Sequence, residues 1–221
     1  MRRLGNLLVG TVLVCSQQSH NARGQHKEKH ENTPAFSYYT LVLSYAPSFC
    51  HQSAGDKDPR ECGVGRRISF VVHGLWAQGE TSRGPEDCGS RGSISDSIMQ
   101  TMLNYIPTEA LINHEWQSHG MCSGLGAEDF FYAIRKARDS LDIPPDLNGS
   151  SQMLELTPTQ IEERFAAENR RFPAKAFRTT CYPDKYLQEV RVCLNRDLSP
   201  RPCGASAGAC SATKVKIPPV Q

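Results

Sequence analysis

The chain has 221 residues, a length typical of one domain with a sizeable core. Its formal charge is +2, with Lys and Arg (25) almost balanced by Asp and Glu (23), and a leader containing Arg2 and Arg3 would take that charge to about zero. The balance excludes a chain that binds polyanions through net charge alone, so any nucleic-acid partner must be argued from a site.

Residues 1–22 have the pattern of a signal peptide, because two arginines precede an apolar run, residues 7–14, that is too short to cross a bilayer. The alternative, a buried core helix, fits the following polar stretch less well. Cleavage after Ser16 or after Ala22 suits the sequence. We expect residues 23–35 to form a flexible arm and residues 36–221 a single domain, with no membrane span.

Eight cysteines remain once the leader is removed: Cys50, Cys62, Cys88, Cys122, Cys181, Cys193, Cys203 and Cys210. In an exported chain an even set predicts four disulfides and an oxidising compartment, hence a periplasmic or secreted protein. Cysteine content alone leaves about 105 pairings open. No C-x-x-C pair occurs, so a structural zinc site has little support.

In chain order the predicted elements are two strands, four helices and two further strands. Residues rich in β-branched and aromatic side chains predict strands at 36–45, 67–73, 177–181 and 188–194. Apolar residues at helical spacing predict helices at 95–106, 108–119, 128–141 and 157–171. These elements indicate an α+β fold, a mostly antiparallel central sheet packed with several helices and stapled by disulfides.

The segment Ile112-Asn-His114-Glu115-Trp116-Gln-Ser118-His119-Gly120-Met-Cys122 concentrates groups able to move protons. On a helix, Glu115 and His119 lie about 40° apart on one face, a turn from each other, with His114 and Ser118 as a second pair beside them. Gly120 is predicted to cap the helix. An acid next to an imidazole on a rigid helix suits proton transfer.

A second stretch, Phe70-Val-Val-His73-Gly74-Leu75-Trp76, places a histidine at the predicted end of a buried strand. Taken alone, His73 is more simply a core histidine that hydrogen-bonds to the backbone. Paired with the segment at 112–122, it becomes a candidate partner for the acid and imidazole there.

Together the two stretches resemble the active-site segments of the ribonuclease T2 family, H-G-L-W-P and H-E-W-x-K-H-G-T-C. Here they read His73-Gly-Leu-Trp76-Ala77 and His114-Glu-Trp-Gln-Ser-His119-Gly-Met-Cys122, and the likeness spans residues 36–210. The resemblance implies an endoribonuclease that cleaves single-stranded RNA by transesterification, through 2′,3′-cyclic phosphates and with low base specificity. It implies no metal or other cofactor, and no cleavage of DNA, which lacks the 2′-hydroxyl nucleophile.

The resemblance also implies roles for individual residues. His119 would be the general base and His73 the general acid, since imidazole, with a pKa of about 6.5, serves either role near neutral pH. Glu115 would stabilise the phosphorane or hold His119 in its working tautomer. The residues expected to contact substrate are His114 at the phosphate, Trp76 stacked on a base, Gln78 at a base edge, and Ser118 at the family's lysine position.

The departures from the family pattern bear on the rate. Ser118 removes a cation that would offset charge on the pentacoordinate phosphorus. Arg66 or Arg67 could substitute for it. Changes at Ala77 and Met121 look tolerable. A catalytically weakened or inactive secreted member that binds RNA or protein is therefore the alternative function.

The family pattern further implies the disulfides Cys50–Cys62, Cys88–Cys122, Cys181–Cys210 and Cys193–Cys203, the second clamping the catalytic helix. A zinc metalloprotease motif needs histidines four apart, whereas His114 and His119 are five apart, about 140° round a helix. We expect a monomer.

Overall fold

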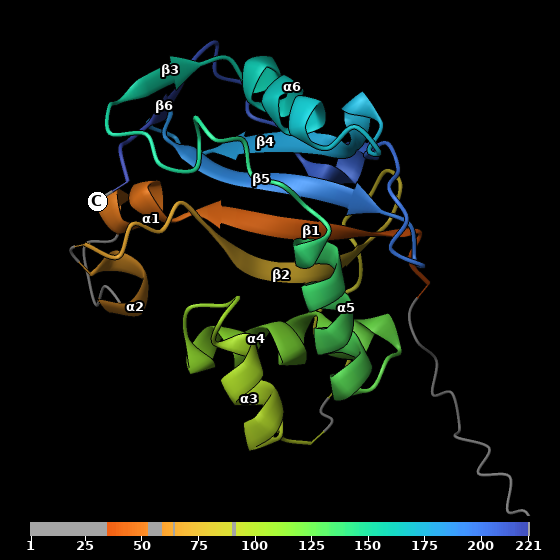
Figure 1. Cartoon of the computed structure of the whole chain (residues 1–221). Coiled ribbons are helices and arrows are strands. Elements are labelled where there is room, and N and C mark those ends of the chain that lie inside the picture. The colour runs from red at the N-terminus through yellow and green to blue at the C-terminus, as the bar shows by residue number, and fades with distance from the viewer. Residues whose placement is uncertain (1–34, 53–58, 64, 90–91, 221) are drawn as a thin grey trace, which may run out of the picture. The chain divides into compact units, whose positions relative to one another are not determined.

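The central sheet of the computed structural model has four antiparallel strands in the order β2–β1–β5–β4 (Figure 1). The strands are β1 (Tyr38–Tyr45), β2 (Phe70–Gln78), β4 (Phe177–Cys181) and β5 (Leu187–Leu194). A small second sheet, which we did not predict, pairs β3 (Leu154–Leu156) with β6 (Val215–Ile217). The structure describes residues 35–52, 59–63, 65–89 and 92–220, all within one compact unit.

Figure 1 shows helices along two edges of the sheet, with α1 and α2 at one end of it. α6 lies beside edge strand β4, whereas α3, α4 and α5 lie beside the opposite edge strand β2. The helices are α1 (Ala46–Gln52), α2 (Pro59–Cys62), α3 (Asp96–Met102), α4 (Glu109–Ser118), α5 (Ala127–Asp139) and α6 (Pro158–Glu168), with 3-10 turns η1 (Gly120–Ser123), η2 (Ala174–Ala176) and η3 (Ala205–Ala207). The predicted α+β class and the mostly antiparallel sheet are confirmed.

One face of the sheet is covered by the apolar core, because alternate residues of each strand point to the same side. Val72 and Val190 are buried on that face, and the Phe165 ring of α6 packs 5.6 Å from Phe70 and 5.7 Å from Phe177, centroid to centroid. The opposite face carries the polar residues described below, so the sheet separates the core from the site.

The predicted end of the second strand was wrong. β2 runs to Gln78, so His73 lies inside the strand and not at its end. Gly74, which suggested an end, lies where a helix approaches too closely for a side chain. Gly120 was also misassigned: His119 caps α4, and Gly120 opens η1, packed where a Cβ would lie 2.3 Å from the Trp116 ring.

Four disulfides staple the described residues: Cys50–Cys62, Cys88–Cys122, Cys181–Cys210 and Cys193–Cys203. They coincide with the pairs implied by the family resemblance. Cys88–Cys122 joins the loop after β2 to the turn after α4, and so ties the ends of two elements that carry candidate residues. The predicted signal peptide and most of the arm lie outside the described residues.

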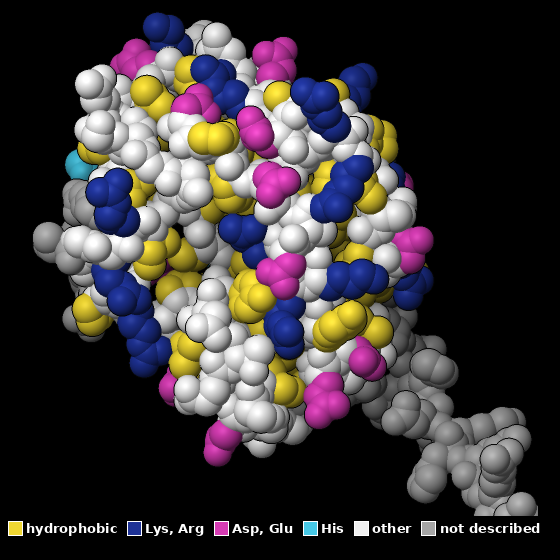
Figure 2. All heavy atoms as spheres, viewed as in Figure 1, with side chains coloured by type: hydrophobic (Ala, Val, Ile, Leu, Met, Phe, Trp, Pro, Cys, Tyr) yellow, Lys and Arg dark blue, Asp and Glu magenta, His cyan; other side chains and the backbone are white. Residues whose placement is uncertain are grey.

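On the face seen in Figure 2, basic and acidic side chains are interspersed, in keeping with the near-balanced charge. Among the described residues, no helix is both long and apolar enough to cross a membrane.

Candidate active site

A β-bulge in β2 positions the first candidate histidine. The ladder with β1 pairs Leu43 with Val72 and Val42 with Gly74, so His73 is an extra residue on the bulged strand. A bulge interrupts the alternation of side chains, and His73 therefore shares a sheet face with Trp76, three residues later. Their ring centroids lie 5.2 Å apart.

Helix α4 supplies the acid and the second histidine. Thr108 caps it by accepting a hydrogen bond from the Leu111 N–H, and Glu115 and His119 follow on one face, the His119 N–H bonding to the Glu115 carbonyl. Trp116 is buried against the ring of Phe130. The apolar side of the helix thus fixes the direction of its reactive side.

Gly74 allows α4 and β2 to meet. A Cβ at this position would lie 1.7 Å from Oε2 of Glu115 and 2.8 Å from Nε1 of Trp76. The Trp76 indole N–H donates to Oε2 of Glu115 at 2.9 Å, which holds the carboxylate over the glycine. The other oxygen, Oε1, is buried without a hydrogen-bond partner and lies 3.6 Å from Nε2 of His73.

His73 lies between two carboxylates. Its Nδ1 is 3.2 Å from Oε1 of Glu189 on β5 and 3.4 Å from Oγ of Ser44 on β1, while Nε2 faces Glu115. Burial favours the neutral ring, but Glu189 and Glu115 outweigh it and raise the pKa of His73 above its ordinary value. Burial likewise opposes charge on Glu189, yet His73 and Arg191 hold the pKa of Glu189 below its usual range.

His119 has the opposite electrostatic environment. Burial, followed by the neighbouring His114 and His73, lowers the pKa of His119 to about 4. Burial raises the pKa of Glu115 to about 7, against the opposing effects of His73 and Trp76. Near neutral pH, therefore, His119 is neutral and able to accept a proton, whereas His73 is the better donor.

The remaining predicted residues surround this centre. The ring of exposed His114 lies 6.2 Å from the ring of His119, centroid to centroid. On its other contact, the His119 ring lies 5.1 Å from the Trp76 ring. Gln78 is buried two residues beyond Trp76 on the same face of β2, its Oε1 without a partner. Ser118 is the last residue of α4 and is partly buried.

Sequence reasoning missed three residues at the site: Ser44, Glu189 and Arg191. Arg191 holds Oε2 of Glu189 and places its guanidinium carbon 5.1 Å from the centre of the Trp76 ring. Arg66, suggested as a replacement cation, instead donates to the carbonyl of Arg60 ahead of β2. The available signal was the alternation Glu-Val-Arg in a predicted strand, which puts two charged residues on one face of an otherwise apolar segment.

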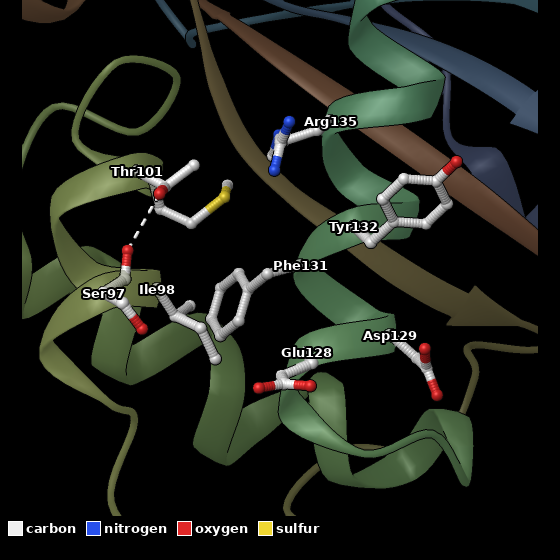
Figure 3. A pocket seen from close by; sticks show the side chains of 9 residues that line it. Ser97, Ile98, Thr101, Glu128, Asp129, Phe131, Tyr132 and Arg135 are labelled. Carbon is white, nitrogen blue, oxygen red and sulfur yellow. Dashed lines mark hydrogen bonds between the residues drawn. The ribbon is translucent and has the colours of Figure 1, made fainter.

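A cavity of about 490 Å³ opens beside His73. It is lined by Ser44, Phe49, Glu61, Val71, His73, Pro107, Thr108, Leu111, Tyr182, Gln188 and Glu189. A second cavity of about 380 Å³ lies between α3 and α5, where the side chains of Ile98 and Phe131 point toward each other and Arg135 extends from α5 toward Thr101 (Figure 3). No histidine lines the second cavity, so the first is the one adjoining the chemistry.

His114, Glu115 and His119 each offer one ligand atom within 4.8 Å of the others. Two ligand atoms that each lie about 2.0–2.2 Å from one zinc ion are less than 4.8 Å apart, so this limit alone does not establish a zinc site. Glu115 is moreover held by Trp76 and faces His73. The arrangement fits a proton-transfer site better than a metal centre.

Known proteins resemble this chain over most of its length. Residues 36–203 match the profile of the Ribonuclease T2 family. The chain belongs to the ribonuclease T2 family. As a member it is an endoribonuclease, and RNA is its substrate.

Relatives span much of the chain. A ribonuclease of Aeromonas hydrophila is 30% identical over 182 residues, which cover 80% of this chain and 77% of that protein. A probable ribonuclease of Haemophilus influenzae is 31% identical over 134 residues, 55% of this chain and 49% of that protein.

Solved structures share the fold. Trichomaglin, described as a novel S-like ribonuclease, superposes with a TM-score of 0.66 at 21% identity, covering 85% of this chain and 100% of that one. An RNase MC1 mutant in complex with 5′-UMP gives a TM-score of 0.64 at 21% identity, covering 81% and 97%.

Proposed function

We propose that this ribonuclease T2 family member cleaves single-stranded RNA by metal-independent transesterification, with His119 as general base and His73 as general acid. The observation that carries the proposal is that the rings of His73 and His119 both lie against Trp76, at 5.2 and 5.1 Å, beside the Glu115 carboxylate. In this setting the pKa of His119 is lowered and that of His73 is raised. A base must be unprotonated and an acid protonated at the same pH, and this site favours that pair of states.

In the first step, Nε2 or Nδ1 of neutral His119 takes the proton of the ribose 2′-hydroxyl, and that oxygen attacks the adjacent phosphorus. Nε2 of His73 gives its proton to the departing 5′-oxygen. A 2′,3′-cyclic phosphate and a free 5′-hydroxyl result. Water can then open the cyclic phosphate with the two histidines in exchanged roles.

Of the two roles we considered for Glu115, stabilising the phosphorane is the better supported. Its oxygens contact Trp76 and face His73, which leaves no contact that would set the tautomer of His119. With its pKa raised to about 7, Glu115 is partly protonated near neutrality and can donate a hydrogen bond from Oε1 to a phosphoryl oxygen. This donor acts where charge develops, which is the most effective place for stabilisation.

The cavity beside His73 suits the nucleotide on the leaving side, because the acid must lie next to the 5′-oxygen. Phe49 and Tyr182 give it aromatic surface, a sequence-tolerant contact for a base. Exposed His114 would contact the phosphate. Trp76 is already contacted by His119 and Arg191, so holding Glu115 is its first role, with base stacking by Trp76 and edge reading by Gln78 as further proposals.

The site retains both histidines and the acid although Ser118 replaces the family's lysine. Arg191 lies beside Trp76 and supplies a cation on the other side of the site. This arrangement supports an active enzyme that is slower than a family member with the lysine. The inactive binding protein has no observation in its favour.

Several further features belong to the proposal. Residues 36–221 act as one monomeric catalytic domain behind a signal peptide at residues 1–22 and a flexible arm at residues 23–35. The protein is exported to the periplasm or secreted, which the four disulfides support. DNA is not cleaved, because it lacks the nucleophile.

The test is RNA digestion by the purified, oxidised protein in the presence of EDTA, beside His119→Ala. Cyclic-phosphate ends from the wild type and none from the variant are expected. An otherwise identical oligonucleotide with one deoxyribose at the scissile position is the matched substrate and should resist cleavage there. Loss of cleavage with EDTA would contradict metal independence, and no cleavage across about pH 4–8, where histidines titrate, would favour the binding protein.

A further inference from the structure

A chain of charged side chains runs from β5 to the general acid. Oε1 of Glu189 lies 3.2 Å from Nδ1 of His73, and Oε2 accepts from Nε of Arg191 at 2.9 Å and lies 2.8 Å from its terminal nitrogen. Each oxygen of the carboxylate thus has its own partner. The other end of the Arg191 guanidinium donates to the carbonyl of Ala207 at 2.9 Å, which anchors the chain in the backbone.

The sheet register brings these groups together. Ser44 of β1 is paired with Glu189, and Val42 is paired with both Arg191 and Gly74. Glu189, Ser44 and the bulged His73 therefore lie side by side on one face. Thr180, opposite Glu189 on β4, adds a hydroxyl 3.4 Å from Oε2.

A purely stabilising ion pair explains this arrangement poorly. Glu189 is 3% exposed, and a buried ion pair often stabilises a fold no better than apolar residues of similar volume. Such a pair would also need no histidine. The placement of Oε1 at Nδ1 is instead that of a partner that sets which ring nitrogen keeps its proton.

We propose that Glu189 is the positioning residue of the general acid: it accepts a hydrogen bond from Nδ1–H of His73, so that Nε2 is the nitrogen that delivers the proton, and Arg191 holds Glu189 ionised. The inference rests on the proposed function and deepens it. After His73 gives up the Nε2 proton, the Nδ1 proton stays on the bond to Glu189, and the neutral ring is left in the tautomer that can take a proton back at Nε2.

Charged and titratable groups reach His73 from two elements. Glu115 and His119 come from α4 and its C-cap, and Glu189 and Arg191 come from β5, while the hydroxyl of Ser44 on β1 is neutral. The carboxylates raise the pKa of His73 and Arg191 lowers it. Removing the negative charge of Glu189 and removing the positive charge of Arg191 should therefore shift the titration of His73 in opposite directions.

The experiment is the pH dependence of kcat/KM for RNA cleavage in Glu189→Gln, Glu189→Asp and Arg191→Gln. Loss of the Glu189 charge lowers the pKa of His73, so the limb where activity falls with rising pH moves down by about 1 pH unit. The kcat falls by about tenfold or more, up to the roughly 10²–10⁴-fold that one proton transfer contributes. Glu189→Asp restores the limb toward wild type, and Arg191→Gln moves it upward.

Glu162→Gln is the matched control, because Glu162 of α6 pairs with Arg178 and accepts from the Thr179 N–H but does not contact the site histidines. It should leave the limb in place. NMR titration of the His73 ring, in wild type and in Glu189→Gln, gives the same pKa shift without relying on activity.

An unmoved limb and an unmoved His73 titration in Glu189→Gln, with lower thermal stability alone, would show a structural ion pair and overturn the inference. A wild type that does not cleave RNA would overturn the proposed function instead. The two failures are therefore distinguishable.

Discussion

Replacing Gly74 with alanine tests whether close packing of α4 on β2 sets the position of Glu115. The new Cβ would lie 1.7 Å from Oε2 of Glu115, half the 3.4 Å at which ordinary contact begins, and 2.8 Å from Nε1 of Trp76. The carboxylate must therefore leave the Trp76 indole, and the 2.9 Å hydrogen bond between them is lost. The direction of movement is away from β2, and thus away from His73.

Two magnitudes follow from this geometry. Overpacking costs typically about 1–3 kcal/mol of unfolding free energy. A displacement of the Glu115 carboxylate by about 1 Å or more costs roughly 100-fold in rate, because charge stabilisation at phosphorus depends on the position of that carboxylate. We therefore expect Gly74→Ala to be folded at 25 °C but to have kcat/KM lowered about 100-fold.

The assay is steady-state cleavage of a short RNA, with denaturant unfolding of the same preparation. Gly149→Ala is the matched control, since a Cβ at exposed Gly149 meets nothing within 4 Å. A Gly74→Ala variant with wild-type kcat/KM would refute the reasoning, because Glu115 would then act from a position that the glycine does not determine.

Three further substitutions have defined outcomes. His114→Ala should raise the pKa of His119, which His114 helps to lower to about 4, and so move the acid limb of kcat/KM to higher pH; an unmoved limb would contradict His119 as the base. Ser118→Lys, which restores the family's cation, should raise the single-turnover rate constant of cleavage by up to roughly 100-fold, and an unchanged rate constant would show that another group already compensates for the missing lysine. Cys88→Ser combined with Cys122→Ser should lower the free energy of unfolding by about 2–4 kcal/mol in denaturant titrations, and no loss would argue against a clamp on α4.

Features that depend on near neighbours were predictable. The helix with Glu115 and His119 four residues apart follows from local hydrogen bonding, and its Thr108 cap lies where the pattern begins. The capping box of Thr157 and Gln160 is likewise present at the start of α6.

The sequence by itself determined the reactive groups, their order and the even set of cysteines, because residue type and helical periodicity act over a few residues. Only the tertiary structure decided how His73 is aimed, since a bulge in β2 depends on its register with β1. It alone revealed Glu189, 116 residues from His73, as the partner of the acid. Strand pairing joins positions that no local pattern connects, and it brings Ser44 and Glu189 to His73.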